Sequence, residues 1–269
     1  MGTMNFEDEG DVRLVQTAVG PLWVDGRDRS LGKTIIKRRE YEPEWTSWAG
    51  GAVKSGMHVV DIGSNIGYYT LLFARCVGDQ GRVIAFEPDP FNRKLLERSL
   101  MEGGMSDRVT VTGAAVGDHV GVCRLHRDAN HRGLHSLSPQ NLIAGDEAAD
   151  IDVPLVTLDA VCGSPGGCAP PDFIKIDAQG AEGAILRGGT KTLGEARHMT
   201  LMIELWPFGL LNCGSSLEEV LECLRQYGFA AFRVRKDDSS AVPCSFEEIS
   251  RRAARLQGDH ASLNLAFTK

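Results

Sequence analysis

Two acidic residues, Asp177 and Glu204, each follow a short apolar run of the kind that forms a buried strand, at residues 173–176 and 201–203. In open parallel sheets the ligand site lies beyond the carboxyl ends of the strands, so we expect both carboxylates on one rim. Such a pair can act as a general base with an orienting partner, or can hold a divalent cation that lowers the pKa of a bound hydroxyl. The sequence leaves both possibilities open.

A glycine-rich turn ends the first strand of the predicted core, where residues 59–67 read VVDIGSNIG. Gly63 would allow a tight turn close to a ligand, and Gly67 would allow the next helix to pack against the strand. A dinucleotide site prefers GxGxxG, whereas the glycines here are spaced GxxxG. Asp61 would repel a pyrophosphate but attract the ammonium and sulfonium charges of S-adenosylmethionine (SAM). The turn, which includes Ser64 and Asn65, therefore favours SAM.

A second acid ends the next strand, at residues 82–87. Glu87 stands 20 residues beyond Gly67 and is followed by Pro88. Its carboxylate can accept hydrogen bonds from both hydroxyls of a ribose. After the third strand, small residues at 113–117, Ala115 among them, would let an adenine ring lie against the backbone. Acids after two consecutive strands strengthen the prediction of a nucleoside cofactor.

Alternating apolar strands and helical segments predict one doubly wound α/β domain with a mostly parallel sheet. We expect strands at residues 58–61, 82–87, 109–112, 122–125, 153–158, 172–176, 199–203, 230–234 and 263–267, and helices at 41–53, 66–77, 90–102, 181–193 and 217–227. Residues 1–45 are predicted to be a leader with a hairpin at 12–24, and 46–269 the catalytic domain. Within it, 127–150 is expected to be a loop insertion near the site, and 163–171 a turn-forming connector.

The composition argues against several classes of protein. A formal net charge of -7 disfavours a nucleic-acid substrate. Seven cysteines without a CxxC pair indicate neither a zinc site nor a disulfide framework. The acidic N-terminus resembles no secretory signal, and no apolar run reaches membrane-spanning length. We expect a cytoplasmic protein without a membrane partner.

The segments VVDIGSNIGYYTLLFA, VIAFEPDP, VPLVTLDAV and FIKIDAQGAEGAILRGG together resemble the FkbM-type SAM-dependent methyltransferases over about residues 41–234. The resemblance implies a class I methyltransferase fold, Rossmann-like, with a seven-stranded sheet, one antiparallel strand and helices on both faces. It also implies O-methylation of metabolites or sugars. It assigns the methionine end of SAM to Asp61, Gly63, Asn65 and Gly67, and the ribose to Glu87. Asp177 and Glu182 become candidates for the reaction centre, although Gln179 stands where family members commonly have Glu.

Other side chains could complete the site. Among the histidines that could act as a base, His135 in the insertion ranks above His131 and His198. Tyr41 and Glu42 could close over the methionine end of SAM. Residues 206–208, Trp-Pro-Phe, could form an apolar wall for an acceptor.

The sequence therefore predicts a methyltransferase that uses SAM on a hydroxyl of a small molecule. Asp177, Glu182, Glu204 and His135 are the candidate catalytic residues, and Asp177 and Glu204 the metal ligands if a divalent cation is used. Two alternatives remain, a nicotinamide-dependent oxidoreductase and a noncatalytic SAM-binding subunit. The sequence leaves the oligomeric state open, with a homodimer as one possibility.

Overall fold

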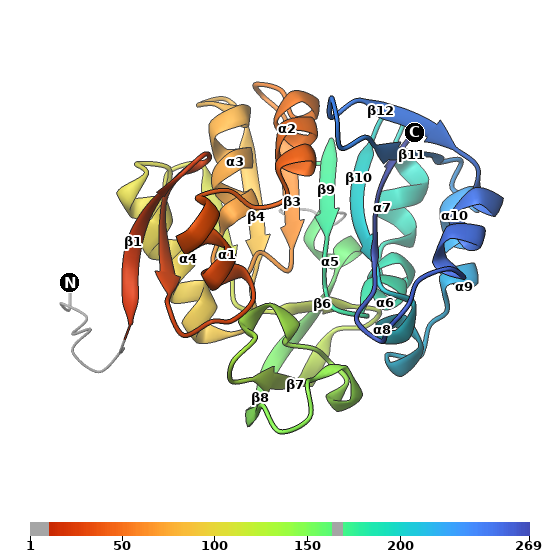
Figure 1. The fold of residues 1–269 in the computed structure, drawn as a ribbon. Coiled ribbons are helices and arrows are strands. Elements are labelled where there is room, and N and C mark those ends of the chain that lie inside the picture. The colour runs from red at the N-terminus through yellow and green to blue at the C-terminus, as the bar shows by residue number, and fades with distance from the viewer. Residues whose placement is uncertain (1–10, 163–168) are drawn as a thin grey trace.

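A computed structural model describes residues 11–162 and 169–269 and is shown in Figure 1. Its central sheet has eight strands in the order β12-β11-β13-β10-β9-β3-β4-β5. These strands are β3 (His58–Ile62), β4 (Arg82–Phe86), β5 (Val109–Thr112), β9 (Phe173–Ile176), β10 (Thr200–Leu205), β11 (Ala230–Val234), β12 (Ala241–Cys244) and β13 (Leu263–Thr268). Strands β3, β4, β5, β9 and β10 are parallel, while β13 lies antiparallel to both β10 and β11.

The predicted fold class is confirmed with one addition. Seven strands with β13 reversed form the predicted sheet, and β12 adds an antiparallel eighth strand at the edge beside β11. Strand β12 was not predicted from the sequence because it is only four residues long and contains Pro243, which a central strand would not tolerate.

Helices cover both faces of the sheet because its strands are apolar on both sides. Val59 and Val60 of β3 contribute to two different apolar cores, since successive strand residues point to opposite faces. One core lies under α2 (Pro43–Ala52), α3 (Tyr68–Val77) and α4 (Pro90–Glu102). The other lies under α6 (Glu182–Arg187), α7 (Thr190–Glu195), α8 (Pro207–Asn212), α9 (Leu217–Gln226) and α10 (Phe246–Ala253), with α5 (Leu158–Cys162) beside it.

The single helix predicted over 181–193 is instead two helices, α6 and α7, separated by Gly188 and Gly189. A Cβ atom at Gly188 would lie 2.0 Å from the carbonyl oxygen of Gly117. The chain therefore needs glycine at this close approach, and two adjacent glycines interrupt the helix.

The leader forms the predicted hairpin, β1 (Val12–Thr17) with β2 (Gly20–Asp25), followed by α1 (Leu31–Arg38). Its turn lies at Ala18 and Val19, because Thr17 pairs with Gly20. The hairpin packs on α4, where the Ser99 hydroxyl accepts a hydrogen bond from the Trp23 backbone N–H at 2.8 Å. Figure 1 shows the leader beside α4 at the edge of the domain.

A second sheet, β6-β8-β7, stands where β3, β4 and β9 end (Figure 1). Its strands are β6 (Ala115–Gly117), β7 (Gly121–Asp128) and β8 (Glu147–Thr157). Much of the predicted 127–150 loop therefore remains irregular, with short 3-10 turns η1 (Arg132–Leu134) and η2 (Pro139–Asn141), but its ends belong to strands. Within the predicted connector, residues 163–168 lie outside the described residues. No described helix is long and apolar enough to cross a membrane.

Candidate active site

Two adjoining cavities open at the carboxyl ends of the parallel strands. The first cavity is lined by Glu87 and Pro88 after β4, by Ala114 and Ala115, and by His135 of the insertion. The second is lined by acids and aromatic rings, among them Tyr41, Tyr69, Glu204, Trp206 and His260. Five residues line both cavities: Gly63, Asn65, Gly133, Asp177 and Gln179. A ligand that spans both cavities must pass these five residues.

The glycine turn is held by close contact with the end of β9. Gly63 has φ +75°, and a Cβ atom there would lie 1.8 Å from the carbonyl oxygen of Asp177. Gly67 has φ +94°, and a Cβ atom there would lie 2.9 Å from Cγ of Leu96. Gly67 therefore allows contact with α4 rather than with its own strand, and it lines neither cavity.

Glu87 presents a buried carboxylate to the first cavity. Its two oxygens accept hydrogen bonds from the backbone N–H groups of Asn65, at 2.7 Å, and Asp89, at 2.9 Å. Burial and the negative charge of Asp89 raise the pKa of Glu87 to about 8. A carboxylate oriented in this way, with its charge poorly stabilised by the protein alone, is suited to accept hydrogen bonds from ligand hydroxyls.

Asp61 corrects the electrostatic expectation from the sequence. Its side chain is fully buried and lines neither cavity. It accepts a hydrogen bond from the Thr70 hydroxyl at 2.6 Å and lies 3.5 Å from the Lys175 ammonium. Asp61 lies at the end of an interior strand, so Thr70 of α3 and Lys175 of β9 enclose it. Its charge therefore supports Lys175 instead of facing a ligand.

Asp177 and Glu204 are brought together as predicted. The Gln179 side-chain amide nitrogen donates to Asp177 Oδ1 at 2.7 Å and to Glu204 Oε2 at 3.1 Å. The Lys175 ammonium lies 3.5 Å from Asp177 Oδ2, and the Ser262 hydroxyl donates to Glu204 Oε1 at 2.8 Å. Burial, followed by the charge of Asp177, raises the pKa of Glu204 well above its ordinary value.

Lys175 connects this pair to the glycine turn. Its ammonium donates to the Gly63 carbonyl oxygen at 3.2 Å. Burial alone would lower the pKa of Lys175, but the carboxylates of Asp177 and Asp61 outweigh burial and raise it. Lys175 therefore pairs with two acids at once, Asp61 and Asp177.

Tyr41 and Glu42 lie at the second cavity, but only Tyr41 lines it. Glu42 accepts hydrogen bonds from the Tyr69 hydroxyl and from the Asn264 side-chain amide, both at 2.7 Å. Burial raises the pKa of Glu42 and of both tyrosines, so the phenols stay neutral. Glu42 therefore fixes the wall of the cavity from behind. Ser64 lines the same cavity.

Glu182 also differs from its predicted place at the reaction centre. Its side chain is buried and lines neither cavity, and its oxygens accept the backbone N–H groups of Ala178, at 2.9 Å, and Gly180, at 3.0 Å. These bonds fix the turn in which Gln179 has φ +50°. Burial raises the pKa of Glu182 to about 7. We interpret Glu182 as a residue that positions Gln179 and Asp177.

The three candidate histidines occupy different places. His135 lines the first cavity, where its Nδ1 accepts the Asp128 backbone N–H at 3.1 Å, and burial lowers its pKa. His131 lies between Asp128 and Asp146, at 3.3 and 3.4 Å. His198 is exposed just before β10 and so lies at the end of that strand opposite the site. Of these three histidines only His135 lines one of the two cavities, and this is the first cavity.

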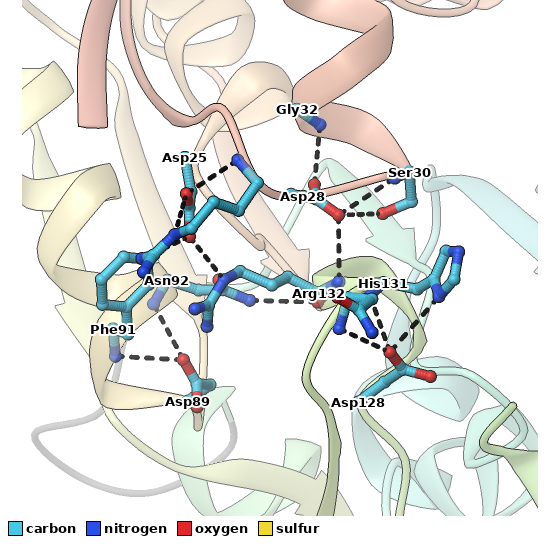
Figure 2. A network of polar contacts seen from close by, with 12 residues as sticks. Asp25, Asp28, Ser30, Gly32, Asp89, Phe91, Asn92, Asp128, His131 and Arg132 are labelled. Carbon is cyan, nitrogen blue, oxygen red and sulfur yellow. Dashed lines mark hydrogen bonds and ion pairs between the residues drawn. The ribbon is translucent and has the colours of Figure 1, made fainter. Parts of the chain in front are cut away.

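Sequence reasoning missed the contacts by which the leader holds the insertion over the cavities, shown in Figure 2. Asp28 accepts hydrogen bonds from the Arg132 backbone N–H at 3.1 Å and from the Ser30 hydroxyl at 2.6 Å. The Arg132 side chain pairs with Asp25 at 3.1 Å. The backbone carbonyl of Arg132 accepts a hydrogen bond from the Asn92 side-chain amide at 3.2 Å. The contacts of Arg132 with Asp28 and Asp25 join residues more than 100 positions apart, so no local pattern indicates them.

The predicted apolar wall is present in part. Trp206 lines the second cavity and its ring stacks on that of His260, with centroids 5.3 Å apart. Phe208 packs obliquely on Trp206 at 6.0 Å and is more exposed. Trp206 is therefore the part of the predicted wall that lines the cavity.

A metal between Asp177 and Glu204 remains a prediction. The Gln179 amide already donates to both carboxylates, and a cation would have to displace it. Among the described residues, one group of three potential ligands is close enough to hold a metal ion: Asp128, His131 and Asp146. Asp177 and Glu204 do not belong to this group.

This fold has a glycine turn after β3 and carboxyl groups at the ends of β4, β9 and β10, and it is the fold of a class I SAM-dependent methyltransferase. The chain belongs to the methyltransferase FkbM domain family, whose model matches residues 61–231, more than half of the chain. The family resemblance stated from the sequence is thereby confirmed.

Solved structures of similar fold include three O-methyltransferases. A SAM-dependent enzyme from Thermotoga maritima is 14% identical, with 96% of this chain and 77% of that chain covered and a TM-score of 0.46. A Bacillus cereus enzyme in complex with SAH is 14% identical, with 88% of this chain and 84% of that chain covered and a TM-score of 0.45. An enzyme of tomaymycin synthesis from Streptomyces achromogenes, in complex with SAM, is also 14% identical. Here 85% of this chain and 80% of that chain are covered, and the TM-score is 0.45. No curated protein matches the chain. The family assignment rests on the domain match.

Proposed function

We propose that this methyltransferase transfers the methyl group of SAM to a hydroxyl group of a small molecule. The observation that supports this most directly is the pair of partly buried carboxyl groups, Asp177 and Glu204, which accept hydrogen bonds from one amide donor and lie beside an aromatic wall. A hydroxyl must lose a proton to become a methyl ether, and a carboxylate that lines the cavity is a suitable acceptor for it.

The residues of the first cavity fit the nucleoside of SAM. Glu87 would accept the ribose hydroxyls, and Pro88, Ala114 and Ala115 would enclose the adenine. The carboxyl groups of the second cavity suit the positive charges of SAM and would repel a pyrophosphate, which argues against a nicotinamide cofactor. When bound, SAM supplies a methyl group activated by a positively charged sulfur.

The acceptor would lie in the second cavity, where Trp206 and Leu134 offer apolar contact. Asp177 lines both cavities and would orient the hydroxyl toward the methyl group and take its proton. The hydroxyl oxygen then bonds to the methyl carbon as the carbon–sulfur bond breaks, and the electron pair of that bond returns to sulfur. Residues 132–137, held by the leader, would exclude water from the reaction.

A panel of hydroxylated, aminated and nucleic-acid acceptors tests this proposal, with formation of S-adenosylhomocysteine (SAH) as the measurement. We expect turnover with a hydroxylated small molecule and none with RNA or DNA. Methyl transfer to amines alone would contradict the choice of oxygen, and SAM binding without turnover on any acceptor would favour the noncatalytic alternative. Activity that survives exhaustive chelation would remove a divalent cation from the mechanism.

A further inference from the structure

Two polar side chains that line the first cavity each carry a buried atom that has no hydrogen-bond partner among the described residues. These atoms are Oδ1 of Asn92 and Nε2 of His135. Asn92 is 1% exposed and the His135 side chain 6% exposed, so bulk water does not serve either atom. A buried polar atom without a partner is destabilising, and a ligand that fills the cavity would supply the missing partners.

The orientation of the Asn92 amide leaves its oxygen as the free atom. The amide nitrogen donates to the Arg132 carbonyl at 3.2 Å (Figure 2), and a carbonyl cannot accept from the amide oxygen, so reversing the amide would lose this bond. The backbone of Asn92 is fixed too, because its N–H donates to Asp89, the residue that caps α4, at 2.9 Å. Asn92 therefore presents a hydrogen-bond acceptor.

His135 is oriented so that its free atom is a donor. Its Nδ1 accepts the Asp128 backbone N–H at 3.1 Å, and burial lowers the pKa of the ring, so the neutral imidazole carries its one proton on Nε2. Nε2 lies 3.9 Å from Oδ2 of Asp89, too far for a hydrogen bond, and that oxygen is already paired with Arg127 at 3.4 Å. The Nε2–H group is therefore a donor without an acceptor.

One acceptor and one donor at the same cavity match an edge of adenine. The amino group at C6 of adenine donates, whereas the ring nitrogens on either side of it accept. Pro88, Ala114 and Leu125 line the same cavity and offer apolar contact to the faces of such a ring. Guanine and hypoxanthine carry an oxygen at C6, which places an acceptor where adenine has a donor. The position of the free acceptor can therefore distinguish among purines.

We infer that Asn92 and His135 recognise the adenine of the cofactor, with Oδ1 of Asn92 accepting from the C6 amino group and Nε2–H of His135 donating to an adjacent ring nitrogen. The inference rests on the proposed function. It assigns His135 to cofactor binding instead of proton transfer from the acceptor. It also makes adenine recognition depend on the insertion, which contains His135 and, through Arg132, orients Asn92.

Calorimetry with SAH and with S-inosylhomocysteine, the analogue of SAH that has an oxygen at C6, tests the inference in the wild-type protein. That oxygen would face Oδ1 of Asn92, acceptor against acceptor, so we expect the analogue to bind at least about tenfold more weakly than SAH. Equal affinities would overturn the inference and leave the proposed function standing. Failure of both SAM and SAH to bind would instead overturn the proposed function, so the two failures are distinguishable.

Variants at the two positions locate the preference. Asn92→Leu removes the acceptor with little change in size and should lower the ratio of SAH affinity to analogue affinity by about tenfold. Asn92→Asp, the matched control, keeps an acceptor oxygen but loses the donor to Arg132, and should retain the preference for SAH. A preference that survives in Asn92→Leu, or that disappears in Asn92→Asp, would contradict the role of Asn92.

His135→Phe keeps a flat ring and removes the donor, so SAH affinity should fall by about tenfold. The same calorimetric titration measures this loss. Undiminished SAH affinity in His135→Phe would remove His135 from adenine recognition and overturn the inference for that residue.

Discussion

The two cavities are built in different ways. The first takes its principal residues from strand ends and turns close together in the chain, at residues 62–65, 86–88 and 114–116. The second combines Tyr41 of the leader with Glu204, Trp206 and His260 from the last third of the chain. The proposed cofactor cavity thus takes about half of its lining from local turns, whereas the proposed reaction centre exists only after the whole sheet has formed.

The cavities also differ in how their acids are stabilised. Glu87 in the first cavity accepts two backbone N–H groups of neighbouring turns. Asp177 and Glu204 in the second depend on side chains, above all Gln179 and Lys175. Backbone donors fix one arrangement, whereas side-chain donors can change rotamer when a ligand binds. This difference suits the first cavity to binding and the second to chemistry.

The largest effect should follow from Asp177→Ala, which we expect to lower turnover by roughly 10³-fold while SAH affinity stays within about threefold. The reason is that its carboxylate acts on the acceptor, whereas the nucleoside is held in the first cavity. Methyl transfer and calorimetric binding of SAH provide the two measurements. Asp177→Asn, which keeps the shape and the contact with Gln179, is the matched control for packing. Unchanged turnover in both variants would refute the assignment.

The reciprocal change in the first cavity is Glu87→Ala. Losing two hydrogen bonds to a charged acceptor, each worth about 1.5 kcal/mol or more, should weaken SAM and SAH binding by about 100-fold. Turnover at saturating SAM should fall much less. Comparing SAM affinity and saturated rate with those of Asp177→Ala tests whether binding and chemistry separate between the cavities. An equal loss of both parameters in both variants would mean that the division is wrong.

A smaller effect is expected for Glu182→Ala, which removes the acceptor for the backbone N–H groups of Ala178 and Gly180. Because these donors are part-buried or buried, we expect the free energy of unfolding to fall by about 2 kcal/mol. Denaturant unfolding measures this, and Glu182→Gln, which retains one oxygen acceptor, should lose less. A loss of turnover with unchanged stability would instead indicate that Glu182 acts in the reaction centre, as the sequence predicted.

Local patterns predicted the first cavity and the sheet, because strand alternation and glycine turns are set by neighbouring residues. Gly63 and Glu87 were placed correctly on this basis. Asp61 was misplaced because the alternation of side chains along β3 does not reveal that Lys175, over 100 residues later, would enclose it. Arg132 and Asp28 were missed for the same reason, since their contact depends on how the insertion folds back over the leader.

The smallest effect concerns pH and the first cavity. Burial and the charge of Asp89 raise the pKa of Glu87 to about 8 in the free protein, so below that pH Glu87 is mostly protonated. Ribose hydroxyls that donate to its carboxylate favour the ionised form, and binding must then release the proton. SAH affinity should therefore increase with pH, by up to about tenfold per pH unit, and level off above about pH 8. Titration calorimetry across this range measures the slope, and Glu87→Gln, which cannot ionise, should flatten it. A slope that is retained in Glu87→Gln but lost in Glu204→Gln would mean that the titrating group lies in the second cavity. The two cavities would then not divide into one for binding and one for proton transfer.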